Sequence, residues 1–539
     1  MAKAKVLVHP GFEIGEISPR LYGAFLEPIG TMVYGSMYNP KHPTADEKGF
    51  RRDFLDALRE SGLPAVRLPG GNYVSGWRWK DSIGPDRKAN LDMAWSQYIP
   101  NDIGHDEYLQ WAELAGLEPM YTVNLGTGTL NDAIDIVEYT NHPGGTYWSD
   151  LRRRNGREAP YGVKTWYLGN EMDGPWQIGS WERNPKGYGI LANEVSKAMK
   201  WTDPSIETVA CVSSSPNLPH YPEWDLEALR ECYNTVDYIS LHHYHSAPIG
   251  DYTGMLGGTA AFEDYINTEI AVSDFVQASL KNPRKMMLSF DEYGSFPRLS
   301  PKPHMGMGPY GFFKSAVDFS PRQYVKHNPD SMREDFFPGR SDMLSALTEA
   351  SVMLIFLRHA DRVKIGCMTE GLRAAAATSR DHVFRNATFY PLTQLIRYGR
   401  GVSLETKIEC EEFSLPGRYV DNDAQYPDRQ GLKYIDAATA YDAASGELTI
   451  FVINRSSETD FSLDLDVSGF KECSFVEHIE MHSSDMLAAN TYENPDAIVP
   501  KSSESATFEN GIVSSVVKRL SWNVFRVKAR NNGDPIIKS

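Results

Sequence analysis

The chain has 539 residues, more than one ordinary hydrophobic core accommodates, so a large domain with a smaller one is expected. Its net charge of −17 argues against a nucleic-acid partner, because such partners bind basic surfaces. The five cysteines show no C-x-x-C spacing, the first residues lack the apolar core of a signal peptide, and no apolar run reaches the roughly 18 residues of a membrane span. We therefore expect a cytoplasmic protein with free thiols and no membrane partner.

Apolar strand-like runs alternate with amphipathic helical patterns through the first 400 residues. Residues 5–19 alternate weakly, which indicates one or two strands ahead of the repeating units. The strand-like runs that follow cover residues 21–27, 65–72, 119–126, 164–171, 207–214, 236–244, 286–292 and 362–370. The main helical patterns cover residues 50–61, 106–115, 131–139, 187–201, 226–233, 262–280 and 341–359. Eight strand–helix units predict an α/β fold, a (β/α)8 TIM barrel.

The pattern changes near residue 400. Short alternating strands over 447–453, 461–467, 474–482 and 520–527 predict an all-β, jelly-roll-like sandwich. The predicted division is residues 1–19 as N-terminal strands that join the sandwich, 20–400 as the barrel and 401–539 as the sandwich. Within the barrel, the segment 296–340 is rich in Pro, Gly and Met and lacks periodicity. Its place at the barrel mouth favours a lid or a pocket wall.

Two of the predicted barrel strands end in a glutamate, Glu171 and Glu292. The C-terminal ends of barrel strands meet at one mouth, where catalytic groups sit. Hydrolysis of a glycosidic bond needs a proton donor for the leaving oxygen and a second carboxylate, about 5–5.5 Å apart in retaining enzymes. A single strand-end glutamate more often serves a salt bridge or a cap, whereas two on facing strands favour catalysis. The pair therefore predicts a glycoside hydrolase.

Further polar side chains at the strand ends are expected to bind the sugar. Asn170 is placed to hydrogen-bond a hydroxyl next to the reacting carbon. Tyr244, at the end of the sixth strand, is placed to hold Glu292 ionised through a hydrogen bond. The remaining members of this predicted polar ring are Glu27, Arg67, Asn72 and Glu370.

Some of these positions also have plain structural interpretations. Arg67 is equally suited to neutralise neighbouring carboxylates, and Asn72, after two glycines, to complete a turn. Trp176 and Trp181 fit a sugar platform and loop packing equally well. Asp291 is predicted to point to the opposite side of its strand from Glu292, in a structural role.

A metal centre is the competing interpretation. His242, His243 and His245 cluster at one strand end, and alternation places His243 and His245 on the same face. Barrel metallohydrolases need further ligands to converge there, and no motif ties in the other histidines. The Gly-Thr-Gly at 126–128 lacks the remaining residues of a phosphate-binding loop. We therefore predict neither a metal nor a cofactor.

The stretch Leu168-Gly-Asn-Glu-Met-Asp-Gly-Pro-Trp-Gln-Ile-Gly179 resembles glycoside hydrolase family 51, the α-L-arabinofuranosidases. Residues 69–76, 141–150, 237–242 and 288–292 are similar to its other blocks, so the likeness covers essentially the whole chain. The resemblance implies a retaining mechanism, an oligosaccharide substrate, no metal and a homo-oligomer, either a hexamer or a trimer-based assembly. It assigns Glu171 as acid/base and Glu292 as nucleophile, and implies sugar contacts from Glu27, Arg67, Asn72, Asn170 and Tyr244.

The sequence departs from the family pattern in several places. Tyr293-Gly-Ser-Phe296 stands where the family usually has Trp-Asn-Val-Trp, and Glu370 stands where it has a glutamine. Such a carboxylate either raises a pKa or requires a cation such as Arg373 nearby. The leading expectation is an exo-α-L-arabinofuranosidase that releases terminal residues from arabino-oligosaccharides. Two alternatives stay open: the same mechanism on another furanoside or a β-glycoside, and a carbohydrate-binding protein without catalysis.

Overall fold

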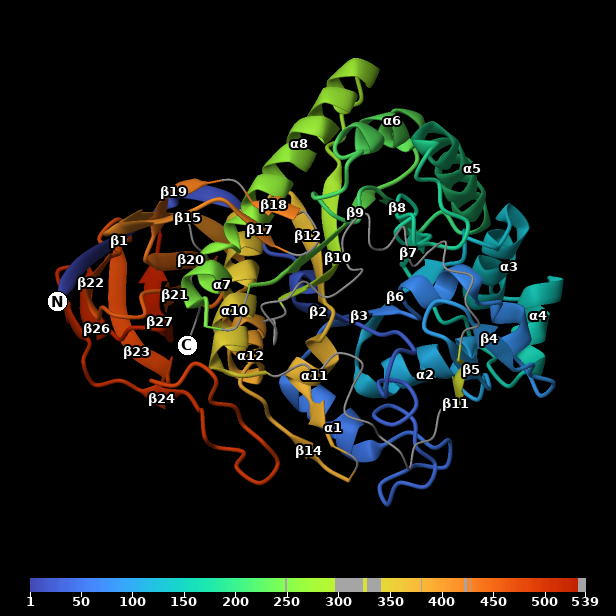
Figure 1. Cartoon of the computed structure of the whole chain (residues 1–539), viewed down its shortest axis with the longest axis horizontal. Helices are drawn as coiled ribbons and strands as arrows, with labels where there is room; N and C mark the ends of the chain where they lie inside the picture. The colour runs from blue at the N-terminus through green and yellow to red at the C-terminus, as the bar shows by residue number, and fades with distance from the viewer. Residues whose placement is uncertain are drawn as a thin grey trace.

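Eight parallel strands close into a barrel at the centre of the molecule (Figure 1). The computed structural model describes residues 1–247, 250–295, 323–326, 341–379, 381–420, 424–426 and 428–531. The barrel order β10-β12-β2-β3-β6-β7-β8-β9 follows the chain, so the predicted (β/α)8 barrel is confirmed. Its strands are β2 (Gly23–Phe25), β3 (Ala65–Leu68), β6 (Glu118–Val123), β7 (Thr165–Leu168), β8 (Glu207–Cys211), β9 (Tyr238–His245), β10 (Met287–Ser295) and β12 (Val363–Met368).

Helices surround the barrel, and all seven predicted helices are present with ends shifted by a few residues. Gly62 and Gly116 end two of them in the left-handed region, with φ of 71° and 76°, which glycine adopts without strain. The predicted helices are α1 (Arg52–Ser61), α2 (His105–Ala115), α3 (Leu130–Asn141), α5 (Pro185–Thr202), α6 (Glu223–Cys232), α8 (Ala260–Leu280) and α10 (Met343–Arg358). Helices α7 (Tyr252–Gly257) and α11 (Gly371–Ala375) were not predicted because they are too short to show a clear apolar period. Helices α4 (Tyr147–Arg154) and α12 (Phe389–Tyr398) were also missed, although α12 is as long as α1 and α6.

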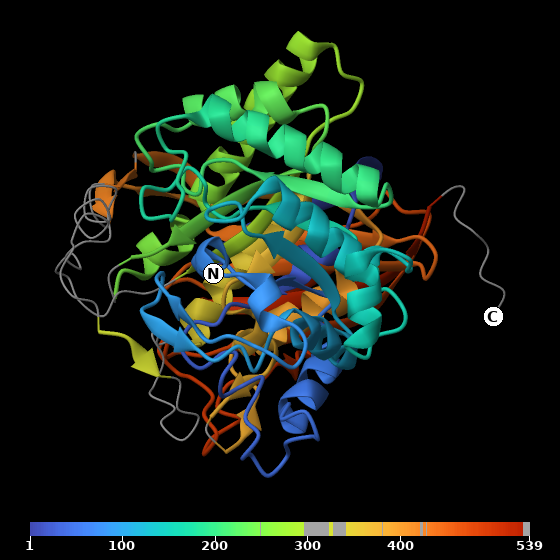
Figure 2. The same cartoon turned by 90° about the vertical axis from the view of Figure 1, so that its right-hand side faces the viewer.

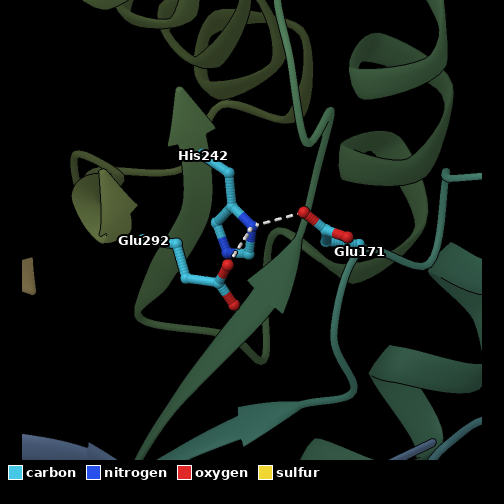
Figure 3. A group of neighbouring side chains, drawn as sticks. All are labelled: Glu171, His242 and Glu292. Atoms are coloured by element: carbon cyan, nitrogen blue, oxygen red, sulfur yellow. Dashed lines mark hydrogen bonds and ion pairs between the residues drawn. The ribbon is translucent and has the colours of Figure 1, made fainter. Parts of the chain in front are cut away.

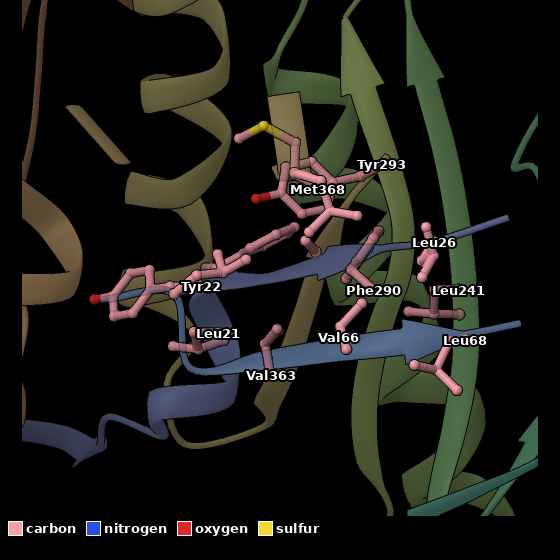
Figure 4. Close-up of a cluster of buried hydrophobic side chains, with 14 of the residues drawn as sticks. Leu21, Tyr22, Leu26, Val66, Leu68, Leu241, Phe290, Tyr293, Val363 and Met368 are labelled. Atoms are coloured by element: carbon pink, nitrogen blue, oxygen red, sulfur yellow. The ribbon is translucent and has the colours of Figure 1, made fainter. Parts of the chain in front are cut away.

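Alternation along the strands separates an inner from an outer core. On β3, Val66 and Leu68 belong to the cluster between the strands and the helices (Figure 4). Ala65 belongs to the inner cluster that fills the barrel, together with Phe25, Met120, Tyr167, Val209, Ile365 and Cys367. The same alternation turns Arg67 inward, where its guanidinium lies 5.0 Å from the ring centre of Tyr167. A charge is therefore buried on the barrel axis.

A ten-stranded sheet forms the second domain, and the N-terminal strand runs through it. Strand β1 (Ala2–Glu16) pairs antiparallel with β15 (Val402–Glu409) and parallel with β22 (Phe461–Asp466). Figure 1 shows blue β1 among the orange and red strands of the chain's last part. The expectation that the N-terminal segment joins this domain is confirmed, whereas the division at residues 19 and 400 stays a prediction. The other strands are β20 (Ile435–Asp442), β21 (Glu447–Asn454), β23 (Glu472–His482), β24 (Lys501–Ser502), β25 (Thr507–Glu509), β26 (Ile512–Val517) and β27 (Ser521–Arg530).

Helix α10 joins the two domains. It contacts β15, β20 and β21 of the large sheet as well as β10 and β12 of the barrel. All of its residues except Arg358 are buried, and most of them are apolar, as a helix packed on several sides requires. At its end, Arg358 lies 2.8 Å from Asp436 of the sheet and 3.4 Å from Glu263 of α8. Apolar packing and ion pairs therefore fix the sheet against the barrel.

Small sheets and turns complete the described chain. They include β4 (Asn90–Asp92), β5 (Gln97–Ile99), β11 (Val325–Lys326), β13 (Ala377–Thr378), β14 (Val383–Phe384), β16 (Glu412–Leu415), β17 (Arg418–Val420), β18 (Ala424–Tyr426), β19 (Arg429–Lys433), and the 3-10 turns η1 (Pro19–Tyr22), η2 (Asn72–Gly76) and η3 (Trp79–Ser82). Most of the predicted lid at 296–340 lies outside the described residues. Its described part, β11, pairs with β5, and the yellow strand lies beside the blue hairpin in Figures 1 and 2. Within the ranges given above, no helix is long and apolar enough to cross a membrane.

Candidate active site

Glu171 and Glu292 meet at the C-terminal mouth of the barrel, with His242 beside both (Figure 3). Glu171 follows β7, Glu292 lies in β10 and His242 lies in β9. One oxygen of each carboxylate and one ring nitrogen of His242 all lie within 4.8 Å of one another. The strand ends that the sequence singled out are therefore brought together, and both carboxylates are buried.

The chain turns sharply at Glu171. Its φ of 44° places a non-glycine residue in the left-handed region, which is uncommon and concentrates at functional sites. Hydrogen bonds from Gly174 N to the Glu171 carbonyl (2.8 Å) and from Trp181 N to the Met172 carbonyl (2.7 Å) close the loop. Asp173 anchors it further, because its carboxylate accepts a hydrogen bond from Ser214 N at 3.0 Å. Trp181 packs against the apolar core, which supports its interpretation as loop packing.

Arg67 holds three groups of the site at once. Its Nε lies 3.0 Å from Asp291 Oδ2, and its Nη1 lies 2.7 Å from Glu292 Oε1. Its Nη2 donates to Asn170 Oδ1 at 2.7 Å. Burial disfavours the charged guanidinium, but the two carboxylates outweigh this and raise the pKa of Arg67 above its already high ordinary value. The interpretation of Arg67 as a neutralising cation agrees with these contacts.

Asp291 lies inside this group, and the prediction that it points to the opposite side of its strand from Glu292 is wrong. The pairing of β10 with β9 is irregular between Ser289 and Glu292, so strict alternation fails there. Both acids consequently contact Arg67. Burial raises the pKa of Asp291, but Arg67 and His242 outweigh it, so the net pKa is lowered and Asp291 stays ionised.

His242 bridges the carboxylates, a role that the sequence did not reveal. Its Nδ1 lies 2.9 Å from Glu171 Oε1 and 3.6 Å from Glu292 Oε2, and its Nε2 lies 3.2 Å from Asp291 Oδ2. Burial lowers the pKa of the imidazole, but the carboxylates outweigh burial and raise it to about 10. His242 is therefore a cation at neutral pH. In the sequence, the cluster of histidines at the end of the sixth strand was the only indication that His242 lies in the site, and it was interpreted as a possible set of metal ligands.

The three histidines do not converge on a metal. His243 packs on Phe262, with ring centres 4.6 Å apart, and burial lowers its pKa to about 3. His245 donates through Nε2 to the Met255 carbonyl at 3.0 Å. Glu171, His242 and Glu292 form the one group in the described ranges with ligand atoms close enough for an ion. Nδ1 of His242 faces Glu171 and Glu292 and Nε2 faces Asp291, an arrangement that favours a doubly protonated ring, and that form has no lone pair for a metal.

The hydroxyl of Tyr244 donates to Glu292 Oε2 at 2.7 Å, the hydrogen bond that the position at the end of the sixth strand predicts. Burial and then the charge of Glu292 raise the pKa of Tyr244 well above its ordinary value, so the phenol keeps its proton. The same oxygen lies 2.9 Å from Thr369 Oγ1, just after β12. Thr369 therefore reaches the site from the eighth strand, which the sequence did not indicate.

Glu27 and the two asparagines line the same mouth. Glu27 Oε1 accepts hydrogen bonds from Tyr73 N (2.7 Å) and Trp95 Nε1 (2.9 Å). Burial raises the pKa of Glu27 to about 8, and the charge of Glu292 adds to the shift. Asn170 Nδ2 donates to Asn72 Oδ1 at 2.9 Å. The predicted polar ring is therefore connected by hydrogen bonds on this side.

Trp176 contacts Glu171 directly, since its indole N–H donates to Glu171 Oε2 at 2.5 Å. Burial raises the pKa of Glu171, and the charge of Glu292 adds to this, whereas the bonds from His242 and Trp176 oppose it. The net shift is upward, the direction that a proton donor needs. Trp176 is thus tied to a glutamate of the site.

Glu370 follows β12 and caps α11. Its Oε2 lies 3.1 Å from Arg373 Nη1, so the cation expected near this carboxylate is present. Glu370 also contributes to the environment of Glu349, whose pKa is raised to about 7 first by burial and to a lesser degree by Glu370. The extra negative charge is therefore balanced locally.

Two family models match most of the chain. The α-L-arabinofuranosidase 1 domain matches residues 57–266, and the α-L-arabinofuranosidase C-terminal domain matches residues 320–521. A Bacillus subtilis protein named intracellular exo-α-(1→5)-L-arabinofuranosidase 1 is 36% identical, over 98% of this chain and all of that protein. A Bifidobacterium longum protein named exo-α-(1→6)-L-arabinofuranosidase is 33% identical, over 98% of each chain.

Solved structures agree with these matches. A family 51 α-L-arabinofuranosidase from Bifidobacterium longum superimposes with a TM-score of 0.82 at 31% identity, over 98% of this chain and 99% of that one. An arabinose complex of the Thermotoga maritima α-L-arabinofuranosidase gives 0.81 at 26% identity, over 97% and 99%. Likeness over the full length, in both sequence and fold, places this chain in glycoside hydrolase family 51, among the α-L-arabinofuranosidases.

Proposed function

We propose that this arabinofuranosidase is a retaining exo-enzyme that releases terminal α-L-arabinofuranosyl residues from arabino-oligosaccharides inside the cell. The observation that carries the proposal is the short separation of Glu171 and Glu292, whose nearest oxygens lie within 4.8 Å. Retaining enzymes hold their two carboxyl groups about 5–5.5 Å apart, whereas inverting enzymes need about 6.5–9.5 Å to admit a water. The measured spacing supports a double displacement.

In the first step, Glu171 gives its proton to the leaving oxygen while Glu292 attacks the anomeric carbon. The upward shift in the pKa of Glu171 supports its role as the acid. Arg67 and Tyr244 each donate to Glu292, which supports its role as the ionised nucleophile. In the second step, Glu171 takes a proton from water, and the water oxygen displaces Glu292 from the sugar.

The sugar contacts are proposed for the polar groups around this pair. Glu27 is protonated at neutral pH, because its pKa is about 8, and it can therefore donate a hydrogen bond to a sugar oxygen as well as accept one. Asn72 and Asn170 supply amides to hydroxyl groups on the neighbouring side. Trp176, bonded to Glu171, and Glu370, after the eighth strand, are proposed as the outer sugar contacts. The exo mode is proposed from the names of both relatives, and the intracellular setting from the name of the Bacillus subtilis protein.

The test uses 4-nitrophenyl α-L-arabinofuranoside with EDTA present and methanol as acceptor. Retention predicts methyl α-L-arabinofuranoside, a product whose anomeric configuration is stable enough for NMR. The β-anomer would overturn the retaining mechanism.

Linear arabinobioses of α-(1→5) and α-(1→6) linkage, other furanosides and β-glycosides complete the panel, because relatives with both linkages in their names match this chain. Turnover of another glycoside alone would keep the two glutamates and reassign the sugar. No detectable hydrolysis of any substrate in the panel would favour a carbohydrate-binding protein without catalysis. The homo-oligomer stays a prediction that light scattering tests.

A further inference from the structure

His242 lies in the centre of the site without taking part in either bond-breaking event (Figure 3). Its Nδ1 faces both glutamates, at 2.9 Å from Glu171 and 3.6 Å from Glu292, while its Nε2 faces Asp291 at 3.2 Å. We propose that His242, held as a cation by Asp291, stabilises the carboxylate form of Glu171, so that Glu171 can act as proton acceptor once Glu292 has become a neutral ester. The inference rests on the proposed double displacement and assigns His242 and Asp291 as positioning residues.

The contacts favour a proton on both ring nitrogens. Asp291 is ionised and Glu292 is the proposed ionised nucleophile, so the oxygens facing Nε2 and Nδ1 call for donors, and a neutral imidazole has only one N–H. The groups that face the ring are Glu171 from the loop after β7, Asp291 and Glu292 from β10, and Ser240 from β9, whose hydroxyl lies 3.4 Å from Nε2. With the charges of Asp291 and Glu292 beside one buried ring, the doubly protonated form is favoured, and the pKa of about 10 agrees.

Asp291 provides a fixed negative charge beside Nε2 of His242. It is fully buried, and its Oδ2 also lies 3.0 Å from Arg67 Nε, so a second cation fixes the carboxylate. The lowered pKa of Asp291 keeps it ionised throughout the reaction. Asp291 touches no reacting atom in this scheme and acts only through His242 and Arg67.

The charge balance changes when Glu292 becomes an ester. In the free enzyme, burial and the charge of Glu292 together outweigh the imidazolium and favour a proton on Glu171. Once that proton has gone to the leaving oxygen and a Glu292 oxygen has bonded to the anomeric carbon, Glu292 is neutral. The imidazolium, still 2.9 Å from Glu171 and no longer opposed by the charge of Glu292, then stabilises the Glu171 carboxylate, the form needed as a base.

The second step reverses this change with all atoms accounted for. Water gives a proton to Glu171, its oxygen bonds to the anomeric carbon, and the sugar–Glu292 bond breaks with its electron pair returning to Glu292. The restored charge on Glu292 again opposes the effect of the imidazolium, and Glu171 keeps the proton for the next substrate. His242 retains both of its protons in every state.

The test is His242→Gln, assayed with 4-nitrophenyl α-L-arabinofuranoside, whose leaving group needs little acid assistance. Without the cation, more of Glu171 stays protonated in the intermediate and less of it can act as the base, so hydrolysis of the intermediate is expected to slow about 100-fold. The intermediate then accumulates, which gives a burst of nitrophenol and lowers kcat and KM together. Azide, which needs no base, restores turnover. The alkaline limb of kcat/KM moves to higher pH, since Glu171 holds its proton more firmly.

Asp291→Asn is the second variant. It is expected to give a smaller burst of nitrophenol and a smaller shift of the alkaline limb of kcat/KM, in the same direction. If His242→Gln does not fold, Asp291→Asn decides. His359→Gln is the matched control, because His359 is likewise bonded to a glutamate, Glu263 at 2.6 Å, at the opposite end of the barrel strands. It is expected to keep the wild-type burst and pH profile.

The inference would be overturned if folded His242→Gln and Asp291→Asn turn over more slowly but show no burst, no response to azide and no shift of the pH limbs. The proposed function would then remain intact. Absence of turnover or of retention in the wild type would instead refute the proposed function itself.

Discussion

Arg67 and Glu292 form an ion pair in which Nη1 and Oε1 lie 2.7 Å apart, and their side chains are 0% and 8% exposed. The two residues are 225 positions apart in the chain, on β3 and β10, and meet only because the barrel closes. The same guanidinium neutralises Asp291, so one cation serves two adjacent carboxylates. The charge of Glu292 is therefore balanced by a cation inside the barrel.

Replacing Arg67 is expected to affect stability as well as activity. Arg67→Ala leaves Asp291 and Glu292 buried without their cation, a change that costs about 3–5 kcal/mol of unfolding free energy. Arg67→Lys keeps the charge but loses the fork that reaches three partners, so it is expected to recover only part of the loss. Denaturant unfolding of both variants measures this. A loss below about 1 kcal/mol in Arg67→Ala would contradict the buried ion pair.

Glu292→Ala is expected to lose roughly 10⁴-fold or more of kcat with any substrate, because no other group can form the intermediate. Near-normal activity would refute the assignment of the nucleophile. Azide is expected to restore turnover by attacking from the vacated side, with an inverted glycosyl azide as product. That product, identified by NMR, separates a missing nucleophile from a misfolded variant.

Trp176→Phe removes the indole N–H that bonds to Glu171 while keeping an aromatic ring. Since that bond opposes the upward shift in the pKa of Glu171, its loss should raise the pKa further. The alkaline limb of kcat/KM is then expected to move to higher pH. Trp181→Phe is the control from the same loop and should leave the limb in place, so equal profiles for both variants would contradict the assignment.

Glu27→Gln is expected to change how stability depends on pH. The folded protein raises the pKa of Glu27 from its ordinary 4.5 to about 8, so between these values the folded state holds a proton that the unfolded state releases. Stability contributed by this group is thus present below pH 4.5 and is lost as pH rises to about 8, by on the order of a few kcal/mol. Glutamine does not titrate, so Glu27→Gln should lose this part of the pH dependence of stability. Thermal unfolding of wild type and variant from pH 5 to 9 tests the prediction, and the same pH dependence in both proteins would refute it.

Glu370→Gln is expected to leave stability within about 0.5 kcal/mol, because its ion pair with Arg373 is partly exposed to solvent. If Glu370 contacts the sugar, the ratio of kcat/KM values between arabinofuranoside and other furanosides changes. An unchanged ratio would remove Glu370 from the proposed sugar contacts.

The sequence by itself determined the eight barrel strands, seven of the helices and the two glutamates at strand ends. These features are local: apolar periodicity reports which face of an element is buried, and a strand that ends in polar residues marks the barrel mouth. The hydrogen bond from Tyr244 to Glu292 followed from the order of the strands around the barrel. The short helices α7 and α11 did not follow, because so few residues carry too little periodicity.

Only the tertiary structure decided where Asp291 and His242 belong. Alternation along a regular strand sends Asp291 away from Glu292, but the irregular pairing of β10 with β9 turns both acids inward. His242 and Glu171 are 71 residues apart, and their contact depends on two separate strands and a loop with a left-handed residue. Where strand pairing is irregular, the neighbouring strands set the direction of a side chain, and the apolar pattern within one strand cannot predict it.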